Sequence, residues 1–375
     1  MHERRTTDRG GGSRVFWACA GFALAIHLTL LASPPAIRGG GDMLPHLRLI
    51  QQMAESPDLR NVYAPGFHVV GALLSGVVGL AAVPKLFGLI GVLTLLGGFR
   101  FFQRSARLPD ASSALFALFP FGFTFSWCLP RVEALGFGLA FIGLGLLVRK
   151  RYVATAALLV VTFVFHTASA LFFGVAGGLL ALTARDAKGI AALAVGTLGA
   201  APLFAAHVAD GCTLAQALLF SQDDYLRARS AWSSLPMLDQ IVVLANPVLV
   251  WLAACGAPEL WRRNRPLAVA CGALTVLYLN ELWLSPLETR TSLDLVRGLS
   301  TLSFPVCVAA GVALENRGRW RLALLGLCAL WAAYGAFVTV PASCMTREIR
   351  LEELEQLQVH RCNFRWRGPH IRRAQ

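Results

Sequence analysis

The chain has 375 residues, of which 56% are hydrophobic and 15% are charged, and its mean hydropathy is +0.58. Soluble domains carry about 25% charged residues, so this composition excludes an ordinary soluble protein and favours a polytopic membrane protein. The formal charge is +13, but no basic stripe with interleaved aromatic residues occurs outside the tail, and no nucleic-acid partner is expected.

The apolar runs recur at lengths near the ~20 residues that cross a bilayer. They lack the period-2 alternation of strands, so they predict helices, which satisfy every backbone polar group within lipid. We therefore expect an all-α, polytopic transmembrane helix bundle with about eleven crossings and one membrane-dipping helix. The crossings are predicted at 15–33, 85–101, 111–128, 134–148, 152–165, 168–183, 189–209, 241–258, 266–284, 297–314 and 322–341, and the dip at 67–82.

This pattern divides the chain into a cytoplasmic segment (1–14), a transmembrane bundle (15–341) with an outer loop at 34–84, and an extracytoplasmic polar tail (342–375). The first apolar run is longer than a signal-peptide core and ends in "LASPPAI", which predicts a retained anchor. In the tail, "TREIRLEELEQLQVH" at 346–360 has the spacing of an amphipathic helix. Whether Cys344 and Cys362 pair is left open by their spacing.

The distribution of basic residues sets the expected orientation. With a cytoplasmic N-terminus, the inner segments hold 18 Lys and Arg residues, against 9 in the outer segments without the tail. This agrees with the positive-inside rule, and it would fail if 67–82 crossed the membrane fully. Most acids, 15 of 21, fall outside and point to an outer working face. We expect a multi-pass protein of the cell inner (plasma) membrane.

Asp42 lies in "IRGGGDMLPHLRLIQQM", directly after the first crossing, with His46 one turn further on. An acid at a membrane face can act as a general base on an acceptor hydroxyl. It can equally be a helix N-cap, where the helix dipole favours a negative charge, and the two roles are compatible.

Two further outer segments carry polar residues. "YAPGFH" ends in His68, which a simple turn into an interfacial helix does not require. "CLPRVEALG" places Arg131 and Glu133 at the outer edge, where they suit a phosphate and a sugar hydroxyl or metal. A hairpin turn with a capping acid explains Arg131 and Glu133 as well.

The run 152–183 is 32 residues long, or about 48 Å as one helix, against a bilayer core of ~30 Å. A break at His166 is therefore expected near the outer face, and a histidine there favours a polar site. Arg290 and Arg297 flank the start of a later crossing and suit a lipid-linked phosphate, although snorkelling arginines paired with nearby acids fit equally. The convergence of these groups on one face indicates a site.

The order of these motifs resembles the GT-C superfamily of integral-membrane glycosyltransferases. The matching segments span residues 15–315 and are "GGDMLPHLRLIQQM", "YAPGFHVVGALLS", "PRVEALGFGLAFIGLGLL", "VTFVFHTASALFF" and "LDLVRGLSTLSFPVCVAAGVAL". The resemblance implies a polyprenyl-phosphate-linked sugar donor, a lipid or glycan acceptor, contact with membrane lipids and an inverting transfer.

Under this resemblance Asp42 and Glu133 are the catalytic residues, with Asp42 as the base and Glu133 positioning donor, acceptor or a metal. His46, His68, Arg131, His166, Arg290 and Arg297 are the expected substrate-binding residues. No metal ligands are assigned, and dependence on Mg²⁺ or Mn²⁺ is left open because Asp42 lacks the second adjacent acid of many relatives. The alternatives are a polyprenyl-linked glycan polymerase or ligase, a transporter of lipid-linked sugars, and a non-catalytic subunit with the same fold.

Overall fold

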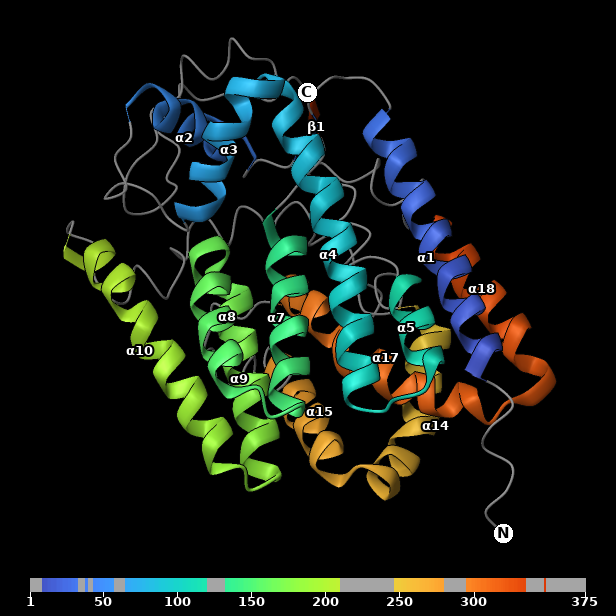
Figure 1. Cartoon of the computed structure of the whole chain (residues 1–375). Helices are drawn as coiled ribbons and strands as arrows, with labels where there is room; N and C mark the ends of the chain where they lie inside the picture. Colours follow the sequence, from blue (N-terminus) through green and yellow to red (C-terminus); the bar gives the residue numbers. More distant parts are fainter. Residues whose placement is uncertain are drawn as a thin grey trace, which may run out of the picture.

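Figure 1 shows a helical bundle, in a computed structural model that describes residues 9–32, 38–39, 43–56, 65–119, 132–209, 246–279, 295–334 and 347–348. The helices are α1 (Arg9–Ala32), α2 (Met43–Glu55), α3 (Pro65–Val78), α4 (Val83–Ser105), α5 (Asp110–Ala117), α7 (Val132–Val148), α8 (Tyr152–Phe165), α9 (Thr167–Thr183), α10 (Ala187–Ala209), α14 (Pro247–Arg263), α15 (Arg265–Tyr278), α17 (Leu295–Glu315) and α18 (Arg321–Tyr334). Two 3-10 turns, η2 (Leu80–Ala82) and η4 (Gly318–Trp320), precede α4 and α18. The predicted all-α class is confirmed.

The predicted crossing at 111–128 is wrong in its described part. The helix there, α5, ends at Ala117, and Leu118 and Phe119 leave the helical conformation. Pro120 explains the early end, because the residue before a proline is disfavoured in the α conformation. The apolar run concealed this boundary.

The predicted crossing at 241–258 instead begins at Pro247. Asn246 has a φ of 55° and caps α14, since its side-chain oxygen accepts from the backbone N–H groups of Val248 and Leu249 at 3.0 and 3.4 Å. An Asn cap followed by proline is a strong start signal that the hydrophobic run obscured. The crossing predicted at 266–284 differs at its C-terminal end. The helix there, α15, ends at Tyr278, and Leu279 is its C-cap.

The amphipathic helix expected at 346–360 is wrong at its start. Arg347 and Glu348 form strand β2, which pairs antiparallel with β1 (Arg38–Gly39), with Arg38 opposite Glu348. This pairing joins segments that are far apart in the sequence, so helical periodicity within one segment cannot reveal it. The rest of 346–360 lies outside the described residues.

Phenylalanines fill the centre of the bundle and join five helices. The rings of Phe99 (α4) and Phe116 (α5) stack with centroids 3.8 Å apart, and Phe141 (α7) meets both edge-on. Phe172 (α9) and Phe304 (α17) complete the cluster, with centroids 5.9 Å apart. All five side chains are fully buried, so burial of aromatic surface fixes the relative positions of these helices.

Glycines let two helix pairs approach closely. A Cβ on Gly98 of α4 would lie within 3.0 Å of the backbone of Gly138 on α7, and a Cβ on Gly256 of α14 would collide with the backbone of Ala309 on α17. Such contacts between small residues are typical of helix packing in membranes, where dispersion rather than the hydrophobic effect drives association.

The bundle has two distinct ends. At the lower end in Figure 1, the connections α4–α5, α7–α8 and α9–α10 turn through residues with positive φ, which are Arg107 (54°), Lys150 (58°) and Arg185 (54°). At the upper end lie α2, α3 and the beginnings of α4 and α7. The basic connections therefore gather at the end opposite α2 and α3, as the charge distribution predicted.

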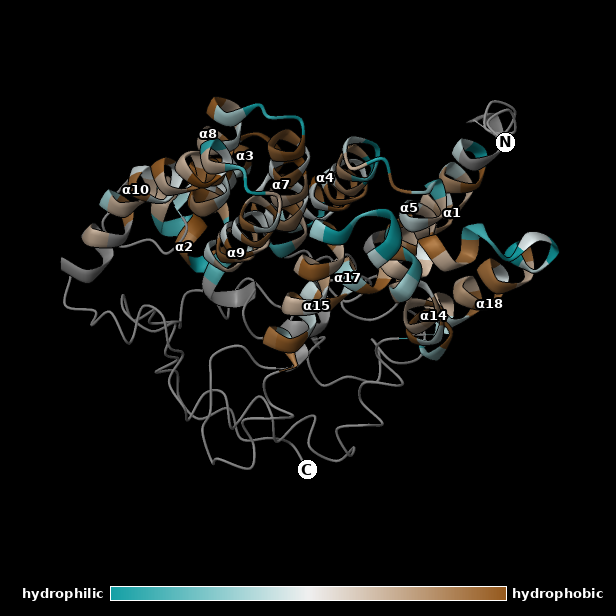
Figure 2. Ribbon diagram, turned by 90° about the horizontal axis from the view of Figure 1, so that it is seen from below, coloured by the Kyte–Doolittle hydropathy of each residue, from teal (hydrophilic) through white to brown (hydrophobic). Residues whose placement is uncertain are grey.

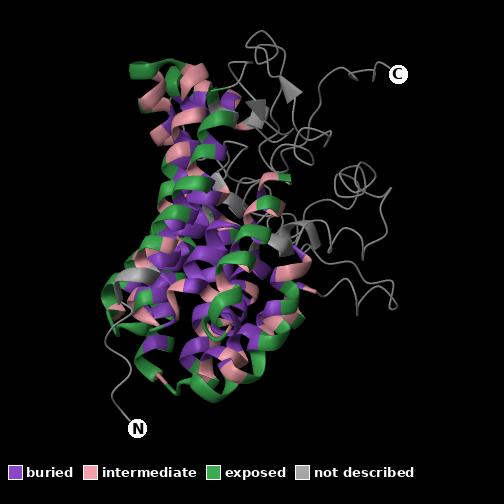
Figure 3. Cartoon of the chain, turned by 90° about the vertical axis from the view of Figure 1, so that its right-hand side faces the viewer, coloured by how far each residue is buried: buried purple, intermediate pink, exposed green. Residues whose placement is uncertain are grey.

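Apolar side chains also cover the outside of the bundle. Hydrophobic residues, brown in Figure 2, run along most of the helices, and Figure 3 shows exposed residues in green on the outside of the bundle and buried residues in purple inside it. Val153 is 86% exposed and Leu198 is 71% exposed. Within the described residues, one helical stretch, Leu80–Ser105, has the length and hydropathy to cross a bilayer, and several apolar helices of 10–17 residues accompany it.

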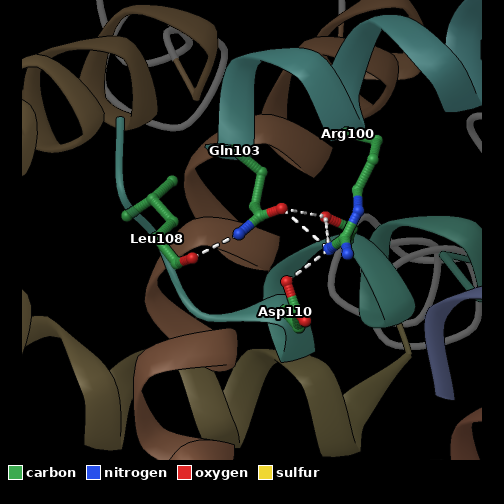
Figure 4. A network of polar contacts seen from close by, with 5 residues as sticks. Arg100, Gln103, Leu108 and Asp110 are labelled. Carbon is green, nitrogen blue, oxygen red and sulfur yellow. Dashed lines mark hydrogen bonds and ion pairs between the residues drawn. The ribbon is translucent and has the colours of Figure 1, made fainter. Parts of the chain in front are cut away.

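A buried polar network holds the α4–α5 connection (Figure 4). Arg100 donates from Nη1 to Asp110 at 2.5 Å and to Gln103 at 2.8 Å, and Gln103 donates in turn to the carbonyl of Leu108. The Arg100 side chain is 8% exposed, so this arginine is an internal ion-pair partner rather than a surface charge.

Candidate functional site

A small apolar cluster joins the segments that carry the predicted site residues. Its buried members are Ile50 (α2), Phe67 (α3), Val83 and Phe87 (α4) and Leu135 (α7), and Phe165 of α8 packs against it. Each of three candidate residues is a close neighbour in sequence: His68 follows Phe67, Glu133 precedes Leu135 by two positions, and His166 follows Phe165. The cluster therefore fixes these segments relative to one another at the upper end of the bundle.

His46 and His68 form a direct hydrogen bond, with 2.9 Å between Nδ1 of His46 and Nε2 of His68. The rings are stacked at an interplanar angle of 25°, and Phe67 meets the His46 ring edge-on. His68 is fully buried, and His46 is partly exposed. The two residues were predicted separately, one in "DMLPHL" and one in "YAPGFH", and the structure brings them together.

His166 breaks the long apolar run as predicted. α8 ends at Phe165, α9 begins at Thr167, and His166 between them is extended, with φ −159° and ψ 108°. Its side chain caps α9: Nδ1 accepts from the backbone N–H of Ser169 at 3.3 Å and lies 2.7 Å from the Ser169 hydroxyl.

The cap places the His166 ring at the start of α9. Nδ1 accepts from the backbone N–H of Ser169 when it is unprotonated, and it can donate to the Ser169 hydroxyl, 2.7 Å away, when it carries the ring proton. In both cases the imidazole lies at a helix N-terminus, where the helix dipole favours anions.

Gly136, one helical turn after Glu133, brings α7 close to the His166 turn at the start of α9. A Cβ added to Gly136 would lie 2.7 Å from the Cβ of His166 and 2.7 Å from the Ser169 hydroxyl. Glu133 is one helical turn before Gly136, in the first turn of α7, and is partly buried. A Cβ added to Gly66, at the start of α3, would similarly lie 3.1 Å from the carbonyl oxygen of Val164 on α8. His46, His68, Glu133 and His166 thus belong to segments in mutual contact.

The remaining predicted residues cannot be placed in the same way. Asp42, Arg131 and Arg290 lie outside the described residues. Arg297 is the third residue of α17, as its position at the start of a crossing predicted, but its side chain is also outside the description.

Two basic residues near this end were not predicted from the sequence. Arg48 of α2 donates to Gln51 at 3.0 Å, while its Nε is buried without a hydrogen-bond partner in the described part of the chain. Lys85, partly buried, lies in the first turn of α4. The sequence signal for Arg48 was its place two residues after His46 on an amphipathic helix, but only packing shows that part of its guanidinium is buried.

The described residues contain no group of three or more His, Cys, Asp or Glu side chains able to hold a metal ion. Nδ1 of His46 and Nε2 of His68 are engaged with each other.

No protein-family model and no curated protein matches this sequence. Ten chains of solved structures match the fold, and two of them show the likeness. An oligosaccharyltransferase from Archaeoglobus fulgidus, tethered to an acceptor peptide with the NVT sequon, aligns with a TM-score of 0.56 and 12% identity over 89% of this chain. ArnT from Cupriavidus metallidurans, bound to undecaprenyl phosphate, aligns with a TM-score of 0.53 and 16% identity over 84% of this chain.

The chain spans 55% of the length of the oligosaccharyltransferase and 62% of that of ArnT. At these identities the likeness concerns the fold. The predicted fold class is confirmed: the chain shares the helical fold of these two enzymes, in agreement with the resemblance to the GT-C superfamily.

Proposed function

We propose that the chain is an integral-membrane glycosyltransferase that moves a sugar from a polyprenyl-phosphate donor to a lipid or glycan acceptor at the outer membrane face. The observation that carries this proposal is the convergence of His46, His68, Glu133 and His166, from contacting segments, at one end of a GT-C-type bundle. The undecaprenyl phosphate bound to ArnT supports a polyprenyl-phosphate carrier.

In this proposal Asp42 is the general base. It takes the proton of the acceptor hydroxyl as that oxygen attacks the anomeric carbon of the sugar, and the bond from that carbon to the phosphate oxygen breaks on the opposite face. The configuration at the anomeric carbon is inverted, and the polyprenyl phosphate leaves with the electron pair. Alignment and charge stabilisation supply most of the rate enhancement, so few protein groups are needed.

His166 fits the role of a phosphate ligand. We assign its imidazole to a phosphate oxygen, because the ring lies at the start of α9, where the helix dipole favours an anion. We assign Arg131, Arg290 and Arg297 to the same phosphate as cations, and Glu133 to positioning the sugar or acceptor. No step is assigned to a metal ion.

The proposal includes the predicted setting. We place the protein in the cell inner membrane as a multi-pass protein, with its N-terminus in the cytoplasm and its tail outside. The basic connections at one end of the bundle and the candidate site at the other support this orientation.

The direct test is donor consumption by the purified protein in lipid nanodiscs. Undecaprenyl-phosphate-linked hexoses and pentoses are supplied with a lipid extract of the source membrane as acceptor, and released undecaprenyl phosphate and new glycolipid are measured by mass spectrometry. We expect release with one donor, and Asp42→Asn to abolish it without affecting expression or insertion. A fully active Asp42→Asn variant rejects the base, and no release with any donor rejects the transferase.

A further inference from the structure

We propose that the protein binds the headgroup of an anionic phospholipid at the end of the bundle opposite the candidate site. The surface that carries this inference is a group of three arginine–tryptophan pairs at the α14–α15 and α17–α18 connections, which we call the Arg–Trp cluster. Its members are Arg265 with Trp261, Arg317 with Trp251 and Arg319 with Trp320. The inference goes beyond the proposed function, because it uses the membrane setting but no step of sugar transfer.

In each pair the arginine guanidinium lies over the face of an indole ring. The distance from Cζ to the ring centroid is 4.8 Å in the Arg265 and Arg317 pairs and 5.6 Å in the Arg319 pair. Tryptophan is the strongest aromatic partner for a cation. A guanidinium stacked on an aromatic face keeps its N–H groups at its edge, where they can bind a phosphate through two parallel hydrogen bonds.

The ion pair between Arg263 and Glu315 brings the two connections together. Nη1 of Arg263 lies 2.5 Å from a carboxylate oxygen of Glu315, and these residues precede Arg265 and Arg317 by two positions each. Arg317 also reaches from the α17–α18 connection to Trp251 on α14. The α14–α15 connection is at the lower end of the bundle in Figure 1, so the cluster lies on the side where the basic connections gather.

The local charge is positive even after the acids are counted. Residues 259–265 and 315–321 hold six arginines and two glutamates. Both glutamates contact Arg263, Glu259 at 2.8 Å and Glu315 at 2.5 Å, so they are engaged outside the cluster. Among the residues that the structure describes, no carboxylate contacts the three arginines of the cluster.

Arg321, the first residue of α18, adds a further cation directly after Trp320. Its Nε is buried and has no hydrogen-bond partner in the described part of the chain. Cations this close in sequence repel one another, and a buried donor without an acceptor costs free energy. An anionic headgroup reduces this repulsion and offers acceptor oxygens.

The surroundings of the cluster favour a lipid over a soluble anion. Trp320 is 60% exposed, and Leu322 and Leu330 on the following helix, α18, are 71% and 69% exposed. Exposed aromatic residues beside exposed aliphatic residues are typical of the boundary between lipid headgroups and acyl chains. The phosphate can therefore meet the cluster while the acyl chains lie along α18.

Positive charge alone is expected at this end, because basic residues gather on the cytoplasmic side of membrane proteins. The α7–α8 connection is an example, since Arg149 donates to Ser105 at 2.8 Å and lies over Phe101, which is partly buried. The arginines of the Arg–Trp cluster, in contrast, make no hydrogen bond to another described residue, and all three indoles are exposed. Basic pockets between helices on this side of a membrane are the usual binding places of anionic headgroups.

The number of cations predicts which lipid binds most tightly. A single phosphate cannot neutralise three arginines, so a lipid with two phosphates, such as cardiolipin, should bind more tightly than phosphatidylglycerol. Phosphatidylcholine should bind most weakly, because its choline group cancels the charge of its phosphate.

The test is native mass spectrometry of the full-length protein in detergent micelles, titrated with each of these three lipids. Each arginine near an anionic headgroup contributes about fivefold to binding, so Arg317→Gln combined with Arg319→Gln should lower the affinity for cardiolipin about 30-fold. Arg104→Gln combined with Arg151→Gln is the matched control, because it removes the same charge from two exposed positions at the same end, and it should match the wild type. Melting temperatures check that each variant is folded.

Two further measurements distinguish a specific lipid site from general attraction. Arg317→Lys combined with Arg319→Lys keeps the charge but loses the planar guanidinium, so its affinity should fall between those of the wild type and the glutamine variant. Glycerol phosphate, added in excess as a soluble competitor, should not displace cardiolipin.

Four results would each overturn the inference: phosphatidylcholine binding as tightly as cardiolipin, equal losses of affinity in the control and glutamine variants, wild-type affinity in the lysine variant, or displacement of the lipid by glycerol phosphate. None of these measurements needs a sugar donor. Cardiolipin binding in a protein that transfers no sugar rejects the proposed function alone, whereas sugar transfer without cardiolipin binding rejects this inference alone.

Discussion

The contact of Gly136 with His166 offers a sharp test of the site, because one methyl group perturbs it. In Gly136→Ala the new Cβ would lie 2.7 Å from the Cβ of His166, 2.7 Å from the Ser169 hydroxyl and 3.0 Å from the Ser169 Cβ. Ordinary carbon–carbon contacts are about 3.5–4.0 Å, so the His166 turn must move back by roughly 1 Å.

Two free-energy effects of this substitution oppose each other. Overpacking costs about 1–3 kcal/mol, while the better helix propensity of Ala over Gly returns up to about 1 kcal/mol. A net loss of about 1–2 kcal/mol lowers the melting temperature by only a few degrees, so the variant should remain folded. A 1 Å displacement near reacting groups lowers a rate by about 100-fold, so the loss of activity should far exceed the loss of stability.

The assay is undecaprenyl phosphate release in nanodiscs, together with thermal unfolding of each variant. Gly174→Ala on α9 is the matched control, because a Cβ there meets no atom within 4 Å. It should keep both activity and stability. Wild-type activity in Gly136→Ala would show that the His166 turn does not set the rate, and this would remove His166 from the site.

Four further outcomes are expected. Gly98→Ala should destabilise the protein by about 1–3 kcal/mol in thermal unfolding, since the added Cβ meets the α7 backbone. In the control Gly97→Ala the added Cβ meets no atom within 4 Å. Equal melting temperatures of the two variants would contradict the α4–α7 packing. Asp110→Asn should cost about 3 kcal/mol of unfolding free energy, because it leaves the buried Arg100 without its ion partner; an unchanged denaturation midpoint would argue against the network. The hydrogen bond that Arg263 donates lowers the pKa of Glu259, so the stability from this contact is present above the ordinary pKa of Glu and is lost as pH falls through the lowered value. Glu259→Gln should therefore make the unfolding free energy less sensitive to acid. An identical dependence of unfolding on pH in the variant and the wild type would refute this. Single cysteines at the exposed positions Arg104, Lys150 and Arg262, in a cysteine-free background, should resist labelling from outside intact cells, and labelling would reverse the proposed orientation.

Local signals in the sequence predicted much of the fold. The apolar run at 152–183 was too long for one straight span, and the break occurs at His166, whose side chain caps α9 by accepting from the backbone N–H of Ser169. The boundaries of α7, α8 and α10 agree with the prediction within a few residues, because hydrophobic length and basic connections mark both ends. The predicted helix boundaries were wrong where a proline or a capping asparagine interrupts an apolar run, as at Pro120 and at Asn246–Pro247.

The site was predicted as a set of residue types, not as an arrangement. His46, His68, Glu133 and His166 were named from polar chemistry in outer segments, but no pattern indicated that Nδ1 of His46 would meet Nε2 of His68. Arg48 was missed, since a basic residue on an amphipathic helix looks solvent-exposed until the partner helix is known. Asp42, Arg131 and Arg290 lie outside the described residues, so their roles stay predictions.

The sequence by itself determined which segments are apolar helices, where the basic connections fall and which outer segments carry polar groups, because these depend on transfer free energies of neighbouring residues. Only the tertiary structure decided that α2 packs against α3, that Gly136 lets α7 approach the His166 turn, and that the His166 ring contacts Ser169. These features depend on contacts between residues distant in sequence, and their energies come from packing and hydrogen bonds that form only when the helices have assembled.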